Sequence, residues 1–438
     1  MELLIITIVL LALAFAGIAV KIWAKKDGKF AGTCASQSPI LNKDGEACGF
    51  CGKMPEEMKD CSGTNKEYYP YMATTLFILF LVVSIINILY YLGYFSFAAA
   101  KNTQPTVSNI PVSIIICAKN EGDNLKRFIP SILNQKYPDF EVILINDASE
   151  DDTLEVMERF VQQDLRVKLV NVQNNEAFWG KKKYALTLGI KKAKNPYLIF
   201  IDADCVPETD FWIEKMAANF DAEKSIVLGY GGYFKYKISF LNKLIRFETL
   251  FTAIQYFSYA KWGLAYMGVG RNLAYSAKEF YDQNGFATHL HVRSGDDDLF
   301  VNRAATARNT AICFDKVAIT RSNPKRSFKS WFRQKRRHVS TARNYKAKHK
   351  LLLGMFYFSQ LAFWILLVFL LVFQTHWQLV LVIFGIRILL QTIVFWKSAN
   401  KLDERDLIWL LTFLELSLIC IQFGIFSFNL FSKPTNWK

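Results

Sequence analysis

Two aspartates that follow a short apolar run are the first residues of this chain whose types and spacing suggest chemistry. Residues 198–201 have the pattern of a buried strand between Pro196 and Pro207, and the strand leads into Asp202-Ala203-Asp204. In the turn after a strand, both carboxylates can converge on one divalent ion, and Mg²⁺ or Mn²⁺ prefers such oxygen ligands. A solvated surface turn could have the same sequence, so the surrounding elements must decide between the two interpretations.

Strand and helix patterns alternate in the region before these aspartates. Residues 112–118 and 140–145 read as buried strands, and an amphipathic helix pattern follows each of them. This alternation, at intervals of about thirty residues, predicts βαβ units and a mostly parallel sheet in an α/β domain.

Polar residues stand where the two earlier strands end. Asn120 and Glu121 follow the first strand, and Asp147 follows the second. Right-handed crossovers bring such strand-end loops to one edge of the sheet, which is where open α/β sheets bind ligands. We therefore expect Asp147 to lie along one cleft with Asp202 and Asp204.

The chain has no Gly-rich phosphate-binding loop of either the G-x-G-x-x-G or the G-x-x-x-x-G-K-[ST] type. A Rossmann dehydrogenase and a P-loop nucleotidase are therefore disfavoured. A diphosphate would instead need a carboxylate-bound cation, with Lys or Arg completing the clamp. Lys181, Lys182 and Lys183 are candidates, although each could equally be a solvated residue of the following helix.

The composition predicts membrane helices around this domain. The 438 residues are 52% hydrophobic and 15% aromatic, which is high for a soluble protein. Segments of about 20 apolar residues, long enough to span a bilayer, occur at 3–23, 72–97, 351–373, 377–396 and 407–431. We expect a transmembrane helix at 72–100, a globular domain at 101–350 and three transmembrane helices at 351–438.

Positive charge is concentrated immediately before the third candidate span. The formal net charge is +15, and residues 321–350 contain 12 Lys or Arg and no acidic residue. Such a stretch beside a membrane helix indicates the cytoplasmic side and contact with anionic membrane lipids, which argues against a nucleic-acid partner. Phe328, Trp331 and Phe332 alternate with these charges as in an interfacial amphipathic helix. The basic connection at 397–406 would also be cytoplasmic.

Residues 1–71 form a separate segment, predicted to be an uncleaved anchor helix followed by a loop. The loop contains Cys34, Cys48, Cys51 and Cys61, and Cys48 and Cys51 have the spacing of a zinc knuckle. Outside the cytosol, the same four residues would form two disulfides. The charges around the first span do not decide on which side of the membrane the loop lies, so zinc and disulfides are both retained.

Six elements occur in the order found in one enzyme family. They are Ala118-x-Asn120-Glu121, the acidic loop at Asp147, Lys182-x-x-Ala185-Leu186, Asp202-Ala203-Asp204, Ser294-Gly295-Asp296-Asp297-Asp298-Leu299 and Gln334-Lys335-Arg336-Arg337-His338. With these elements, the central domain resembles a family 2 glycosyltransferase of the GT-A fold. The resemblance covers the whole central domain, and the flanking spans are similar to the membrane-bound processive branch, which includes synthases of hyaluronan, cellulose and poly-N-acetylglucosamine. Ceramide glucosyltransferase is a related member that does not polymerise.

The resemblance implies a role for each element. Asp147 would bind the base of the donor nucleotide, expected to be uracil, Asp202 the ribose or diphosphate, and Asp204 the metal. Asp296 would be the general base for an acceptor hydroxyl that attacks the anomeric carbon with inversion. Nucleotide-sugar contacts are also expected from Asn120, Glu121, Lys182, Gln334, Arg337 and His338.

Three positions depart from the family pattern. Asn146 stands where the first of two Asp is usual, and Gly295 stands where a Glu is usual, so the base could be Asp296, Asp297 or Asp298. His338 stands where a Trp normally lies near the acceptor, which puts processive polymerisation in question.

The sequence therefore predicts a multi-pass membrane glycosyltransferase, expected in a bacterial inner membrane with its catalytic domain in the cytoplasm. It would use a divalent metal and move a sugar from a nucleotide-sugar to a lipid or a growing glycan. The alternative is a non-catalytic membrane scaffold that binds a partner through the cysteine-containing loop.

Overall fold

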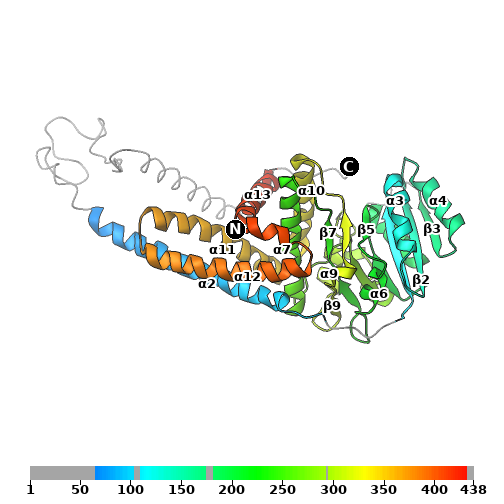
Figure 1. Cartoon of the computed structure of the whole chain (residues 1–438), viewed down its shortest axis with the longest axis horizontal. Coiled ribbons are helices and arrows are strands. Elements are labelled where there is room, and N and C mark those ends of the chain that lie inside the picture. Colours follow the sequence, from blue (N-terminus) through cyan, green and yellow to red (C-terminus); the bar gives the residue numbers. More distant parts are fainter. Residues whose placement is uncertain (1–64, 103–108, 174–180, 293, 432–438) are drawn as a thin grey trace, which may run out of the picture. The chain divides into compact units, whose positions relative to one another are not determined.

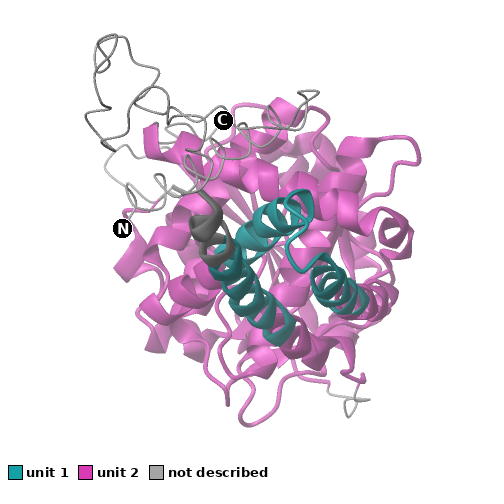
Figure 2. Cartoon of the chain, turned by 90° about the vertical axis from the view of Figure 1, so that its left-hand side faces the viewer, with its two compact units in different colours: residues 1–89, 356–389 teal, residues 90–355, 390–438 magenta. Residues whose placement is uncertain are grey.

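The computed structural model describes residues 65–102, 109–173, 181–292 and 294–431. The chain divides into two compact units, residues 1–89 with 356–389 and residues 90–355 with 390–438 (Figure 2). The predicted first span and the four N-terminal cysteines lie outside the described residues.

A mostly parallel sheet forms the centre of the second unit (Figure 1). Strand β8 is antiparallel to both of its neighbours, whereas every other pair in this sheet is parallel. The predicted α/β class with a mostly parallel sheet is confirmed, and β8 is an addition that the repeating pattern did not predict. Among the described residues, the seven strands in spatial order are β3 (Val167–Val172), β2 (Phe140–Asp147), β1 (Val112–Ala118), β4 (Tyr197–Phe200), β8 (Leu273–Ser276), β6 (Ile226–Leu228) and β9 (Thr310–Ile312).

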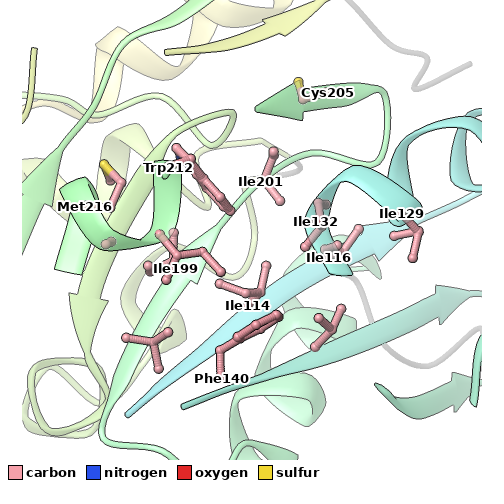
Figure 3. Packing of buried hydrophobic residues seen from close by; sticks show 14 of the residues in the cluster. Ile114, Ile116, Ile129, Ile132, Phe140, Ile199, Ile201, Cys205, Trp212 and Met216 are labelled. Carbon is pink, nitrogen blue, oxygen red and sulfur yellow. The ribbon is translucent and has the colours of Figure 1, made fainter. Parts of the chain in front are cut away.

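Helices cover both faces of this sheet, because successive residues of a strand point to opposite sides. Ile114 and Ile199 belong to a buried cluster with residues of α3 (Gly122–Leu133), α4 (Thr153–Gln163) and α6 (Trp212–Ala217) (Figure 3). On the other face, α5 (Lys181–Lys192) packs so closely that a Cβ at Gly189 would lie 2.1 Å from the Ile145 side chain. The two helix layers hold the strand ends rigidly at one edge.

A second sheet and a long buried helix complete the domain. Strands β5 (Cys205–Pro207), β10 (Thr320–Ser322) and β7 (Gly231–Tyr233) form the smaller sheet, in the order β5-β10-β7. Helix α7 (Phe240–Lys261) is buried around most of its circumference, so its aromatic residues are mainly core. The remaining elements are α8 (Ala277–Asp282), η3 (Ala287–His289), α9 (Asp298–Ala304), η4 (Lys316–Ala318), α10 (Phe328–Thr341) and η5 (Ala342–Asn344).

Four helices among the described residues are long and apolar enough to cross a membrane, at Ala73–Ala98, Ala347–Val372, Trp377–Lys401 and Arg405–Phe431. They correspond to α2 (Asn65–Ala98), α11 (Ala347–Val372), α12 (Trp377–Lys401) and η6 (Arg405–Leu410) with α13 (Leu411–Phe431). Within the first unit, Phe80 stacks on Phe363 with 5.3 Å between ring centroids, and Leu367, Leu370 and Val380 complete this small core.

An ionic network joins α7 to the connection between α12 and α13. The Arg246 guanidinium donates to Glu404 and Asp406, and Arg246 and Glu404 are only 1% and 0% exposed. Arg321 of β10 also donates to Glu404 over 3.4 Å and to Asp403 over 2.7 Å. Burial raises the pKa of Glu404 even though both arginines oppose that shift.

We expect Arg246→Met to destabilise the protein by roughly 3–5 kcal/mol, because it leaves the buried Glu404 carboxylate with two longer contacts, from Arg321 Nη1 over 3.4 Å and from the Tyr230 hydroxyl over 3.3 Å. The midpoint of thermal unfolding of the purified full chain measures the effect. Lys243→Met on the same helix is the matched control. Equal midpoints for the two variants would contradict the assigned role of the network.

Candidate active site

Three neighbouring strands bring the predicted residues to one edge of the sheet. The spatial order β2-β1-β4 places Asp147, at the end of β2, and Asp202, just after β4, on either side of the end of β1. Cys117 of β1 lies between them, and the charges of Lys182, Asp147, Asp296 and Asp202 all act on its thiol. Asp147 and Asp202, which the sequence placed along one edge, thus both act on the thiol of Cys117.

The loops after β1 and β2 are fastened to each other. The Asn120 backbone N–H donates to Ser149 Oγ over 3.0 Å, and Asn120 Oδ1 accepts from the Glu150 N–H over 2.8 Å. The Glu121 N–H donates to Thr153 Oγ1 over 2.8 Å. Asn120 adopts a φ of 55°, which asparagine tolerates better than most residues. Asn120 and Glu121 thus shape the loop that follows Asp147.

Asn146 has a structural use that accounts for the departure from the family pattern. Its side-chain nitrogen donates to Asn171 Oδ1 over 2.8 Å, and its oxygen accepts from the Ser149 N–H over 3.2 Å. An aspartate could not donate the first of these bonds.

Lys182 at the start of α5 links two of the predicted motifs. Its Nζ lies 3.2 Å from Asp202 Oδ1 and 2.9 Å from Asp296 Oδ2. Burial would lower the pKa of Lys182, but the two aspartates raise it well above its ordinary value. Lys182 is therefore a fixed positive charge between a strand-end carboxylate and the loop before α9.

The Asp202-Ala203-Asp204 turn places possible cation ligands together. Oxygens of Asp202 and Asp204 and the Cys205 sulfur all lie within 4.8 Å of one another. Burial raises the pKa of Asp204, and the negative charges of Asp202 and Glu121 raise it further. Asp204 has no ion pair in the part of the chain that the structure describes, so a cation could bind there, and the two carboxylates provide the oxygen donors that Mg²⁺ and Mn²⁺ prefer.

Arg271, which the sequence did not single out, also acts on these aspartates through its charge. Its Nη1 donates to the Gly232 carbonyl over 3.1 Å and to Ser322 Oγ over 3.4 Å, and its guanidinium covers the Tyr233 ring at 4.3 Å. Burial would lower the pKa of Arg271, but Tyr233, Cys205 and the two aspartates raise it overall. No signal in the sequence indicated Arg271, because its contacts Gly232, Tyr233 and Ser322 belong to strands of the smaller sheet that are distant from it in the chain.

The three consecutive aspartates occupy different environments. Asp298 accepts hydrogen bonds from Thr341 and Tyr345 and is 8% exposed. Asp297 accepts the Gly270 N–H over 2.7 Å, and burial together with the two adjacent aspartates raises its pKa to about 7. Burial would also raise the pKa of Asp296, but the ion pair with Lys182 lowers it below its ordinary value.

The backbone before these aspartates explains the second departure from the family pattern. Gly295 has a φ of 93°, and a Cβ there would lie 2.5 Å from the Leu299 side chain. A glutamate at this position would be strained, so glycine is the residue that this loop conformation requires.

Lys183 fixes the same loop from beneath. Its Nζ donates to the carbonyls of His289, Val292 and Ser294 over 2.7, 2.8 and 2.9 Å, and the residue is 1% exposed. Burial lowers the pKa of Lys183 to about 8 against the opposing charges of the three aspartates. We interpret it as a positioning residue for the aspartate loop.

We expect Lys183→Met to lower kcat about a hundredfold, because small displacements of reacting groups have effects of that size. The donor KM should change much less, since Lys182 still faces Asp202. In wild type, kcat should fall as the pH rises above about 8, where the ammonium loses a proton and one of its donors. Steady-state kinetics against Lys191→Met on the same helix test this, and a rise in KM with unchanged kcat would contradict it.

Helix α10 carries the last predicted group. Lys335 pairs with Glu248 of α7, which fastens the helix to the core. The charges of Asp296, Asp202 and Asp297 act on Arg337, although burial lowers its pKa overall. Desolvation and the charges of Lys335 and Arg337 lower the pKa of His338 far below its ordinary value, so its imidazole is neutral. The Gln334 side-chain oxygen is buried without a hydrogen-bond partner among the described residues.

A cavity of about 20 Å³ lies where Lys182, Asp202, Gly270, Asp296 and Asp297 meet. This volume holds about one water molecule. The ion pairs of Lys182 thus close the centre of the site.

Comparison with known proteins assigns this region to a family. Residues 113–278 match the model of Glycosyl transferase family 2. An uncharacterized glycosyltransferase of Haemophilus influenzae is 34% identical over 126 residues, which are 28% of this chain and 48% of that protein. The poly-beta-1,6-N-acetyl-D-glucosamine synthase of Staphylococcus epidermidis is 33% identical over 99 residues, 23% of each chain. The chain thus spans about half the length, or less, of these relatives.

Solved structures with a similar arrangement share little sequence with this chain. The mannosyltransferase PcManGT from Pyrobaculum calidifontis, in complex with GDP-Man and Mn²⁺, is 16% identical with a TM-score of 0.48, and the match covers 76% of this chain and 98% of that one. S. aureus TarS 1–349 is 18% identical with a TM-score of 0.38, over 72% and 90% of the two chains.

The family match extends from β1 through β4 to the start of α8, and it includes Asp147, Lys182, Asp202 and Asp204. The mostly parallel α/β sheet is the one expected for the GT-A fold. Residues 113–278 of this chain are therefore a family 2 glycosyltransferase domain.

Proposed function

We propose that the chain is a membrane-bound inverting glycosyltransferase that moves a sugar from a nucleotide-sugar to a lipid or growing glycan acceptor. The observation that carries this proposal is the ammonium of Lys182, which lies within 3.2 Å of Asp202 and 2.9 Å of Asp296. The Lys182 ammonium joins the turn proposed to bind the donor to the loop that contains the base candidates. A transferase needs the diphosphate-binding group and the general base on opposite sides of the anomeric carbon.

Asp204 and Asp202 would hold Mg²⁺ or Mn²⁺. When bound, the ion would neutralise charge on the diphosphate of the donor. Lys182 pairs with Asp202, and the charge of Arg271 acts on Asp202 and Asp204, so both cations would stabilise the departing diphosphate with Arg337. The central cavity of about 20 Å³ is much smaller than a nucleotide-sugar, so the donor would extend beyond it toward Asp147 and Asp204.

The general base would be Asp296 or Asp297. Either carboxylate would accept the proton of an acceptor hydroxyl as that oxygen attacks the anomeric carbon and the bond to the diphosphate breaks. Asp298 already accepts hydrogen bonds from Thr341 and Tyr345 beneath the site, so we assign it a positioning role. Attack from the face opposite the leaving group inverts the anomeric configuration.

The nucleotide base would bind beside Asp147, in the loop that Asn120 and Glu121 shape. Gln334 and His338 would face the donor or the acceptor from α10. The buried Gln334 oxygen without a partner among the described residues supports a contact with substrate.

The basic segment before α11 and the connection after α12 support a cytoplasmic catalytic domain in a multi-pass protein of a bacterial inner membrane. Arg246 and Arg321 of the domain bind acidic residues of that connection, so both belong on the same side of the membrane. Nucleotide-sugars are made in the cytoplasm, which agrees with this orientation.

Release of nucleoside diphosphate by the purified full chain tests the proposal. We would screen UDP-sugars and GDP-sugars with Mg²⁺ or Mn²⁺, starting with UDP-N-acetylglucosamine because one relative is named as a poly-N-acetylglucosamine synthase. We expect hydrolysis or transfer with one donor, and product length will distinguish single transfer from polymerisation. A folded protein that is inactive with every donor would favour the non-catalytic scaffold.

A further inference from the structure

A second cavity, of about 520 Å³, lies within the second unit and away from every residue assigned to catalysis. Its size is typical of ligand pockets, which are roughly 300–1,000 Å³. The C-terminal ends of α2 and α12 and the segment after β9 form its walls. We call it the Lys401 pocket, and it is lined by Ala98, Ala99, Ala100, Asn102, Phe314, Asp315, Lys316, Lys397, Asn400 and Lys401.

The Lys401 pocket is strongly positive. Lys316, Lys397 and Lys401 line it, and the charge of Lys261 also acts on Lys401. Asp315 is the one acidic residue of the lining, and its carboxylate accepts the Val317 N–H over 3.0 Å. In the part of the chain that the structure describes, no ion pair involves any of the three lining lysines. The pocket therefore holds positive charge that an anion would neutralise.

Two of the lysines are held in place. Lys401 Nζ donates to the carbonyls of Phe97 and Ala100 at the end of α2, and its ammonium lies 5.1 Å from the centre of the Phe314 ring. The Lys397 ammonium lies 5.3 Å from the centre of the Phe95 ring. These contacts fix both ammonium groups before any ligand arrives, which lowers the entropic cost of binding.

The helix surfaces that lead to the Lys401 pocket are apolar and exposed. Leu92 and Phe95 precede it on α2 and are 52% and 38% exposed, and Trp396 precedes it on α12 and is 52% exposed. Both helices are candidate membrane spans that end at the pocket. Exposed aromatic residues at the end of a span are typical of the membrane interface. A lipid could therefore place its acyl chains against these residues with its headgroup in the pocket.

We propose that the Lys401 pocket binds a phosphate group, and specifically the headgroup phosphate of an anionic phospholipid. Free phosphate offers the same chemistry but would leave the exposed apolar surfaces of α2 and α12 uncovered. The lipid fits both the lysines and these surfaces. Occupation would join the ends of α2 and α12 to the segment after β9 and so fasten the catalytic domain to the bilayer.

Native mass spectrometry of the delipidated full chain in detergent tests this proposal. The probes are phosphatidylglycerol, phosphatidylcholine and inorganic phosphate, each titrated separately. The variant is Lys316→Gln with Lys397→Gln, which spares Lys401 because that residue caps α2. The control is Lys325→Gln with Lys348→Gln, which removes two exposed lysines from the basic segment and the start of α11.

We expect one phosphatidylglycerol to bind wild type and the control more tightly than phosphatidylcholine does. Its affinity should fall about fivefold for each pocket lysine removed, or roughly 25-fold in the double variant. Equal affinities for the two lipids, or equal losses in the variant and the control, would overturn the proposal. Binding of inorganic phosphate without binding of phosphatidylglycerol would overturn the assignment to a lipid.

The midpoint of thermal unfolding is a second readout, and without lipid it shows whether each variant is folded. Phosphatidylglycerol should raise the midpoint of wild type and of the control but not that of the double variant. Catalysis does not enter this readout, so failure of the lipid proposal and failure of the proposed transferase activity would be distinguishable.

Discussion

Asp296→Asn is expected to lower kcat by roughly 10²–10⁴-fold, the usual contribution of a general base, with little change in donor affinity. Asp296 is the base candidate that the family resemblance favours, and its carboxylate lies 2.9 Å from Lys182. The amide cannot accept a proton from the acceptor hydroxyl, yet it retains the volume of the carboxylate. Turnover of the donor identified in the screen measures the effect.

Asp297→Asn and the pH dependence of kcat/KM decide between the two base candidates. Asp297 has a pKa of about 7, so if it is the base, kcat/KM should rise with pH through about 7 as its carboxyl ionises. The ion pair with Lys182 lowers the pKa of Asp296, so with Asp296 as the base the rate should stay constant down to a much lower pH. We expect the second profile and the larger loss for Asp296→Asn. A profile with an apparent pKa near 7 and a larger loss for Asp297→Asn would transfer the role to Asp297.

Asp298→Asn is the matched control for both variants. Its carboxylate binds Thr341 and Tyr345, so this change should lower the midpoint of thermal unfolding more than the other two do. A loss of kcat without a loss of stability would contradict its positioning role.

Asp204→Asn is expected to lower activity at least a thousandfold and to abolish the dependence on Mg²⁺ or Mn²⁺. A metal ion that stabilises the diphosphate contributes several kcal/mol to the reaction, which corresponds to this factor. Binding of Mn²⁺ to the full chain, followed by electron paramagnetic resonance, should be lost together with the activity. Cys205→Ser is the matched control and should retain most of both, because these ions prefer oxygen to sulfur.

The same substitution should stabilise the metal-free protein. Burial, Asp202 and Glu121 raise the folded pKa of Asp204 above its ordinary value, so stability is lost as the pH rises and the buried carboxyl ionises in the metal-free protein. Asn removes this cost and should raise the midpoint of thermal unfolding at pH 7 in a chelator. Full activity and metal dependence in Asp204→Asn, or an unchanged midpoint, would contradict the assignment of Asp204 to the metal.

Much of the domain could be predicted from local sequence because its units are local. The strands β1, β2 and β4 are continuous apolar runs buried between two helix layers, and each ends in polar residues. Periodicity therefore indicated the parallel sheet, the edge at which ligands bind and the residues at that edge. Strand β4 has only four residues, but Pro196 and the Asp202-Ala203-Asp204 turn mark its two ends. Strands β6, β8 and β9 are equally short, with three or four residues each, and no such acidic turn follows them.

The sequence by itself determined the fold class, the family of the domain and the set of charged residues from which a site could be built. The tertiary structure decided how that set is used. It pairs Lys182 with Asp202 and Asp296, places Lys183 under the aspartate loop, turns Asp298 toward Thr341 and Tyr345, and brings the charge of Arg271 to act on Asp202 and Asp204. Each of these contacts joins residues far apart in the chain, and their energies depend on distance and burial, which residue type and spacing alone do not specify.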